Sequence, residues 1–146
     1  MKKIIFLSIS LILTLNTAIA QDWQTDFTTA KNIATKNGES IILVFQGSDW
    51  CAPCIRLDKE ILSTSEFKAL AKEQFVMLQA DFPRRKKNAL PKAQQEHNNK
   101  LAAQYNLNGY FPYVVILNEK GTVLGSLGYE KTTPELYFKK IKAFEK

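Results

Sequence analysis

The chain has 146 residues, of which 45% are hydrophobic and 23% are charged, and its formal net charge is +6. This composition is typical of an ordinary globular protein, and the length suits one domain with its own core rather than two. The modest charge, with no repeated aromatic residues among the basic ones, argues against a nucleic-acid partner, and a single histidine with two cysteines cannot supply the usual four ligands of a zinc site.

Residues 1–20 have the pattern of a secretory signal peptide. Lys2-Lys3 precedes an apolar run over residues 4–15, and Ala18-Ile19-Ala20 forms an A-x-A cleavage site. An apolar run of this length is short of the roughly 20 residues that a membrane span needs. We therefore predict cleavage near Ala20, a mature domain over residues 21–146, and a periplasmic or secreted location. Loss of the two lysines lowers the basic count from 20 to 18 against 14 acidic residues, so the formal charge falls to +4.

The first half of the mature chain predicts a helix, a buried strand and a second helix. Asp22 is expected to cap the first helix, with Trp23 and Phe27 on its apolar face and Gly38 at its end. The run over 41–45 is continuously apolar and rich in β-branched residues, as a strand buried on both faces requires. Apolar residues then recur at helical spacing. The pair Ser63 and Glu66 has the spacing of a capping box, which predicts that this helix breaks and resumes there.

The second half predicts another buried strand, a polar helix, a hairpin and a final helix. The strands are expected at 75–80, 113–117 and 122–127, the polar helix from Pro91 to about Tyr105, and the last helix from Pro134, framed by Thr132 and Glu135. The basic cluster Arg84-Arg85-Lys86-Lys87 falls in an irregular insertion, and a solvated loop is favoured there over a nucleic-acid or membrane surface. Parallel pairing early and a hairpin late predict a mixed central β-sheet flanked by helices, a three-layer α/β/α fold.

The cysteines Cys51 and Cys54 stand three residues apart where the buried strand passes into a helix. Unpaired N–H groups and the positive end of the helix dipole are expected to stabilise Cys51 as a thiolate there, and Cys54 lies one turn away, within reach of a disulfide. A bridge that closes so short a loop stabilises a fold little. Redox chemistry is therefore favoured over a structural disulfide or a metal site, with a redox-active Cys51–Cys54 pair and no other cofactor.

This element order resembles the thioredoxin superfamily over nearly all of the mature chain. The resemblance rests on Trp50-Cys51-Ala52-Pro53-Cys54 after the buried strand and on Phe111-Pro112 before the hairpin, and Gly47–Cys51 and Asp81–Pro83 look like secreted bacterial thioredoxin-related proteins. It implies a thioredoxin fold in which Cys51 attacks, Cys54 resolves and Pro112 is a cis-proline facing them. Trp50, Pro53, Phe111 and Pro112 are then expected to contact the substrate.

The chain departs from thioredoxin near the resolving cysteine. Thioredoxin has a buried aspartate five residues before the active-site tryptophan, whereas this chain has Phe45 there, and the lysine that partners the aspartate is replaced near Met77. Water or another carboxylate, Asp49 or Glu60, would then accept the proton of Cys54. Phe111 also replaces the usual threonine before the cis-proline, which makes the contact surface more apolar.

The direction of the reaction follows from what surrounds the thiols. Ala52-Pro53 offers no charge or side-chain donor between the cysteines, so we expect a reducing protein that acts on disulfide-containing proteins, with a potential nearer about −270 mV than about −120 mV. The sequence leaves open whether such a protein acts as a reductase or as an isomerase. The chain has no second dithiol, so we expect a membrane-embedded dithiol protein to supply its electrons. We expect the protein itself to be a monomer. The alternative is a thioredoxin-fold binding module or chaperone, which Phe45 favours. His97 is expected to be a surface residue without a catalytic role.

Overall fold

The computed structural model describes residues 22–145, so the predicted signal peptide lies outside the described residues. One mixed sheet is formed by five strands, β1 (Trp23–Gln24), β2 (Ser40–Gln46), β3 (Phe75–Asp81), β4 (Tyr113–Leu117) and β5 (Val123–Leu127). Their order in the sheet is β1-β3-β2-β4-β5. β2 is parallel to β3 and antiparallel to β4, so the strand that leads to the cysteines lies at the centre.

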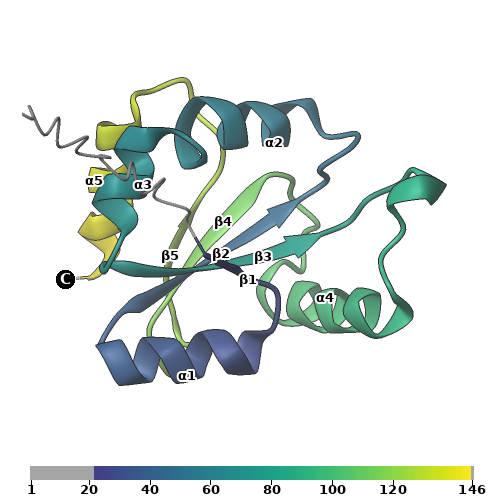
Figure 1. Cartoon of the computed structure of the whole chain (residues 1–146), viewed down its shortest axis with the longest axis horizontal. Coiled ribbons are helices and arrows are strands. Elements are labelled where there is room, and N and C mark those ends of the chain that lie inside the picture. The colour runs from purple at the N-terminus through teal and green to yellow at the C-terminus, as the bar shows by residue number, and fades with distance from the viewer. Residues whose placement is uncertain (1–21, 146) are drawn as a thin grey trace, which may run out of the picture.

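Helices cover both faces of this sheet (Figure 1). They are α1 (Phe27–Asn37), α2 (Ala52–Leu57), α3 (Ser65–Ala71), α4 (Lys92–Tyr105) and α5 (Pro134–Lys142), joined by a π turn η1 (Asp58–Leu62) and the 3₁₀ turns η2 (Lys86–Asn88) and η3 (Ala143–Glu145). α1 and α4 lie on one face, and α2, α3 and α5 on the other. The three-layer α/β/α thioredoxin fold expected from the sequence is confirmed. No helix among the described residues is long and apolar enough to cross a membrane.

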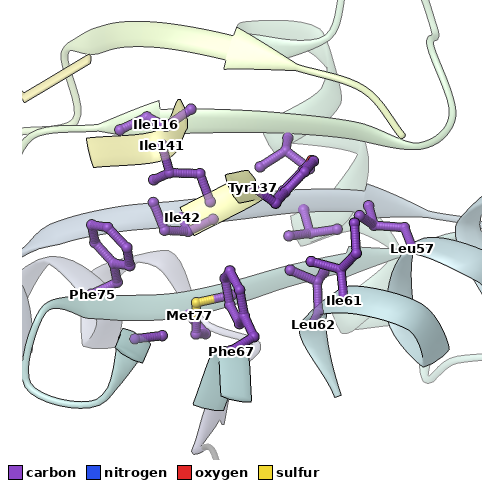
Figure 2. Close-up of a cluster of buried hydrophobic side chains, with 13 residues drawn as sticks. Ile42, Leu57, Ile61, Leu62, Phe67, Phe75, Met77, Ile116, Tyr137 and Ile141 are labelled. Carbon is purple, nitrogen blue, oxygen red and sulfur yellow. The ribbon is translucent and has the colours of Figure 1, made fainter. Parts of the chain in front are cut away.

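Successive side chains of β2 point to opposite faces of the sheet, and this divides the core into two clusters. Ile42 and Val44 face α2, α3 and α5, where they pack with Phe67 and Tyr137, and Figure 2 shows the labelled side chains of this cluster converging between the layers. Ile41, Leu43 and Phe45 face α1 and α4. Because successive side chains of a strand point to opposite faces, a central strand with both faces covered must be apolar throughout, as the run over 41–45 is.

The first helix starts later than the sequence predicts. Asp26, not Asp22, is the N-cap of α1, and its Oδ1 accepts a hydrogen bond from Thr29 N at 2.7 Å. Trp23 belongs instead to β1, which pairs with β3 at the edge of the sheet. The predicted end is confirmed, because Gly38 adopts the left-handed conformation with φ of 71° that favours glycine.

Two other helix caps lie one residue beyond their predicted positions. Thr64 caps α3 by accepting from Phe67 N, whereas Ser63 donates its hydroxyl to Asp58. Thr133, not Thr132, caps α5 immediately before Pro134. In both places the neighbouring hydroxyl residue is an equally good acceptor, so only the path of the chain decides which one caps the helix.

Candidate active site

The two cysteines lie where β2 hands the chain to α2. Gly47 has no room for a side chain, because the indole of Trp50 occupies the position that a Cβ atom would take. The Cys51 N–H donates to the Gly47 carbonyl oxygen at 2.9 Å, which closes the turn. Pro53 then falls in the first turn of α2, where its missing N–H leaves no intrahelical bond unmade. The sequence therefore delivers Cys51 to the start of a helix, as predicted.

Cys51 and Cys54 are joined in a disulfide, with their Cα atoms 5.2 Å apart. Cys51 is the N-cap of α2, and its Sγ accepts a hydrogen bond from Cys54 N at 3.2 Å. Both residues are buried, at 4% and 3% exposure. On reduction, the same N–H and the positive end of the helix would stabilise a Cys51 thiolate, which is the nucleophilic form of cysteine.

A groove of about 530 Å³ is lined by Pro53, which stands between the two cysteines in the chain. The Phe111–Pro112 peptide bond is cis, as the resemblance implied, and both residues line the groove with Pro53. Trp50 lies against Phe111, with ring centroids 5.5 Å apart. The four residues expected to contact substrate are therefore brought together, and a groove lined by proline and aromatic side chains can receive an extended polypeptide.

Three tyrosines complete the walls of this groove. Tyr110 and Tyr113 both line it, and Tyr110 is 57% exposed. Tyr129 also lines it and was not anticipated, because it follows β5 in a stretch without a recognisable pattern. The Tyr129 hydroxyl donates to Glu60 at 2.6 Å, and Arg56 lies over its ring. The hydrogen bond to Glu60 raises the pKa of Tyr129, so the hydroxyl stays protonated as a donor.

Phe45 does not lie beside Cys54, where the comparison with thioredoxin would place it. Phe45 is fully buried in the cluster under α1 and α4 and stacks on Tyr113, on the face of the sheet opposite α2. The neighbouring residue of β2, Gln46, faces the α2 side and lines a cavity of about 440 Å³ with Cys54 and Gln79. Gln46 Nε2 donates to Gln79 Oε1 at 3.4 Å. Polar side chains therefore do lie beside the resolving cysteine.

The carboxylate in this cavity is Asp58, one turn after Cys54. The candidates expected from the sequence, Asp49 and Glu60, are engaged elsewhere: Asp49 holds the segment after β3, and Glu60 accepts from Tyr129. Asp58 accepts a hydrogen bond from the Ser63 hydroxyl at 2.6 Å. A carboxylate in the cavity that Cys54 lines can accept the thiol proton directly or through a water molecule.

Asp49 anchors the insertion to the active site. Its two carboxylate oxygens accept from Arg84 N at 2.9 Å, Arg85 N at 3.0 Å and Asn88 Nδ2 at 2.8 Å. These bonds, the Arg84 N–H foremost, hold the pKa of Asp49 below its ordinary value of 3.8. Trp50 adds a second attachment by donating its indole N–H to the Phe82 carbonyl oxygen at 2.8 Å. The insertion therefore begins as part of the active-site structure.

Replacing Asp49 with alanine should free this segment without unfolding the domain. We expect trypsin to cleave after the basic residues 84–87 about tenfold faster in Asp49→Ala than in the wild type, because charge-assisted hydrogen bonds that close the segment are lost. Limited digestion followed by mass spectrometry measures this rate. Glu96→Ala, on the exposed side of α4, is the matched control. Equal cleavage in both variants would show that Asp49 does not hold the segment.

The same anchor has a defined pH dependence. The pKa of Asp49 is lower in the folded protein than in the unfolded chain. The ionised carboxylate therefore stabilises the folded segment fully above the ordinary carboxyl range, and this stabilisation is lost as the pH falls through the lowered folded pKa. The protection factors of the amides at residues 84–88, which are exchange rates corrected for the intrinsic effect of pH, should therefore stay constant through the ordinary carboxyl range and fall at more acidic pH.

His97 is a structural residue rather than a free surface side chain. It is half-buried on α4, and its Nε2 accepts a hydrogen bond from Phe27 N, the first residue of α1, at 3.2 Å. This bond satisfies one of the N–H groups that a helix start leaves unpaired. Residues 22–145 contain no group of three or more His, Cys, Asp or Glu side chains suited to a metal ion.

Comparison with known proteins agrees with this geometry. Residues 22–119 match the family model described as thioredoxin-like. The disulfide bond reductase DsbH of Chlamydia pneumoniae is 40% identical over 103 residues, and the thioredoxin-related protein DsbJ of the same organism is 26% identical over 110 residues. The matches cover 70% and 74% of this chain but only 60% and 31% of those two relatives.

Solved structures show the same arrangement of strands and helices. A DsbH oxidoreductase superposes with a TM-score of 0.77 at 33% identity, covering 84% of this chain and 83% of the other. A putative disulphide-isomerase from Bacteroides thetaiotaomicron, at 23% identity and a TM-score of 0.62, covers 88% of this chain and 94% of its own, and shares the fold. The chain belongs to the thioredoxin-like family.

Proposed function

We propose that this protein is an exported thiol-disulfide oxidoreductase that reduces disulfide-containing proteins. The observation that carries the proposal is the Cys51–Cys54 disulfide at the start of α2, beside a groove formed by the cis-proline Pro112 and aromatic side chains. Similarity to a disulfide bond reductase supports it. The protein uses the dithiol itself as its redox group and needs no other cofactor.

The reaction proceeds by two thiolate attacks. The Cys51 thiolate attacks one sulfur of a substrate disulfide, forms a mixed disulfide and releases the other substrate sulfur as a thiolate. Cys54 then loses its proton to Asp58 or water and attacks Cys51 Sγ. This step releases the second substrate sulfur and leaves Cys51 and Cys54 oxidised, so two electrons have passed to the substrate. Trp50, Pro53, Phe111 and Pro112 hold the substrate chain during both steps.

A reduction potential measured on the mature protein tests the proposed direction. Equilibration with glutathione and dithiothreitol buffers should give a value below roughly −220 mV, because the helix terminus is the main stabiliser of the reduced form and Ala52-Pro53 adds no charge. A value above roughly −150 mV would make the protein an oxidant or isomerase. A pair that does not exchange with the buffers would favour a thioredoxin-fold binding module or chaperone.

Export and re-reduction complete the proposal. The signal peptide over residues 1–20 directs the domain over 21–146 to the periplasm or outside the cell, where each turnover leaves the dithiol oxidised. A membrane-embedded dithiol protein passes electrons to Cys51 and Cys54. If the in-cell redox state of the pair stayed the same after deletion of every such donor, this partner would be excluded.

A further inference from the structure

The segment formed by residues 82–90, between β3 and α4, runs out beyond the end of β3 at the right of Figure 1. It is attached to the active site in two ways. Trp50 donates to the Phe82 carbonyl oxygen at the start of the segment, and Asp49 accepts from Arg84 N and from Asn88 in the turn η2. Phe82 also packs edge-on against Phe111, with ring centroids 5.5 Å apart. The segment is therefore a fixed neighbour of the substrate groove, not a distant loop.

Four consecutive cations project from this segment. Arg84, Arg85, Lys86 and Lys87 are all exposed. The Arg84 guanidinium lies 3.6 Å from the centroid of the Trp50 ring, on the residue that precedes Cys51. The salt bridges among residues 22–145 involve other lysines, so none of these four side chains forms a salt bridge in the described part of the chain, and only Arg85 has its charge felt by a carboxylate, that of Asp49.

The carboxylates of Asp49 and Asp81, which bind this segment, already accept hydrogen bonds from other groups. Asp49 accepts from the backbone of the segment and from Asn88, and Asp81 accepts from Ser48 N, the Ser48 hydroxyl and Phe82 N. These bonds fix the backbone of the segment, and they do not require basic side chains at 85–87. The fold therefore does not explain a run of like charges, which repel one another beside the active site.

We propose that Arg84, Arg85, Lys86 and Lys87 form a docking surface for acidic residues that flank the substrate disulfide. This inference rests on the proposed reductase function and adds a substrate class to it. A chain lying in the groove beside Phe111 passes within reach of these charges, because Trp50 contacts the Phe111 ring and carries the Arg84 guanidinium over its own ring. Charge complementarity of this kind accelerates encounter and selects partners.

The partner is an acidic polypeptide rather than an anionic membrane. A segment that inserts into the membrane interface buries apolar side chains beside its basic ones. Here Phe82 is turned inward onto Phe111, Leu90 is half-buried, and the tip of the segment is Lys86–Asn88. The segment thus presents charge without an apolar face, next to a thiol pair that acts on polypeptides.

Two disulfide-linked peptides of the same core sequence, one flanked by aspartates and one by serines, test the proposal with dithiothreitol-reduced protein. The variant Arg85→Ser/Lys86→Ser/Lys87→Ser keeps Arg84 on Trp50. The control Lys36→Ser/Lys100→Ser/Lys120→Ser makes the same charge change at exposed positions elsewhere. At low salt we expect the ratio of kcat/KM for acidic over neutral peptide to fall about tenfold in the first variant and to stay at the wild-type value in the control.

Ionic strength gives an independent readout. The wild-type preference should shrink between about 10 mM and 150 mM salt, as the screening length falls from about 30 to 8 Å. Equal wild-type rates on the two peptides would overturn the docking surface and leave the reductase intact, whereas failure to reduce either peptide would overturn the proposed function. Co-sedimentation with phosphatidylglycerol vesicles that the first variant loses, together with equal peptide rates, would assign the charges to a membrane instead.

Discussion

Cys54→Ser should convert the proposed reductase into a trap for its substrates. Cys51 in this variant can still attack a disulfide, but no second thiol is present to release the mixed disulfide. Steady-state reduction of a protein disulfide should fall at least about a thousandfold. Covalent complexes that dithiothreitol reduces should accumulate. Non-reducing electrophoresis with mass spectrometry identifies the partners in them.

Cys51→Ser is the matched control for the trap. Cys54 lies within α2 and lines the cavity with Gln46 and Asp58, and it lacks the N-cap position that stabilises a Cys51 thiolate, so it should form few mixed disulfides when it is the sole thiol. This variant should lose reduction to the same extent and capture nothing. Retained reduction in Cys51→Ser, or equal capture by both variants, would contradict the assignment of Cys51 as the attacking thiol.

Phe45→Asp should unfold the domain, even though it introduces the aspartate that thioredoxin has five residues before the active-site tryptophan. Phe45 is fully buried among apolar side chains, so the change removes a packed ring and leaves a carboxyl without a partner. The ring alone is worth about 3–5 kcal/mol, and the buried charge adds to that loss, against a typical stability of about 5–15 kcal/mol. Urea unfolding followed by circular dichroism measures the difference.

Gln46→Asp is the informative counterpart, since it places an acid in the cavity that Cys54 lines. Gln46 is half-buried among polar groups, and we expect this variant to fold with a stability within about 1.5 kcal/mol of the wild type. Asp58→Asn should slow release of the mixed disulfide at neutral pH, and combining it with Gln46→Asp should restore the rate. A stable Phe45→Asp protein would show that Phe45 faces the cavity after all.

The introduced carboxyl of Phe45→Asp also has a predictable pH dependence. Burial favours its neutral form, so its folded pKa lies above the unfolded value. Its destabilising effect is then smallest at acidic pH and grows as the pH rises and the unfolded chain ionises.

The order of elements and the position of the dithiol could be predicted because each rests on a local pattern. The apolar run over 41–45, the spacing of Cys51 and Cys54 and the Phe111-Pro112 pair are all visible in short windows of sequence. The environment of Cys54 could not be predicted in the same way. Residues 45 and 46 point to opposite faces of β2, and a shift of one position in the comparison with thioredoxin exchanges a core residue for a cavity residue.

Contacts between distant segments were also beyond the sequence. Asp49 reaches Arg84 across 35 positions, and no periodicity connects a residue before the cysteines with a polar insertion after the next strand. The strand β1 has two residues, too few to show alternation, so Trp23 was assigned to the helix that follows. The basic cluster was recognised as exposed, but its place beside Trp50 depends on these unpredicted contacts.

The position of β1 brings the start of the described chain close to the redox site. Trp23 pairs with Met77 at the edge of the sheet, and its side chain lines the cavity of Cys54. A cut after Ala20 leaves two residues between the new amino terminus and Trp23, a reach of at most about 10 Å. If the proposed cleavage occurs, the new amino terminus would carry a positive charge two residues before this strand, so precursor and mature protein would differ in charge near the cavity of the resolving thiol.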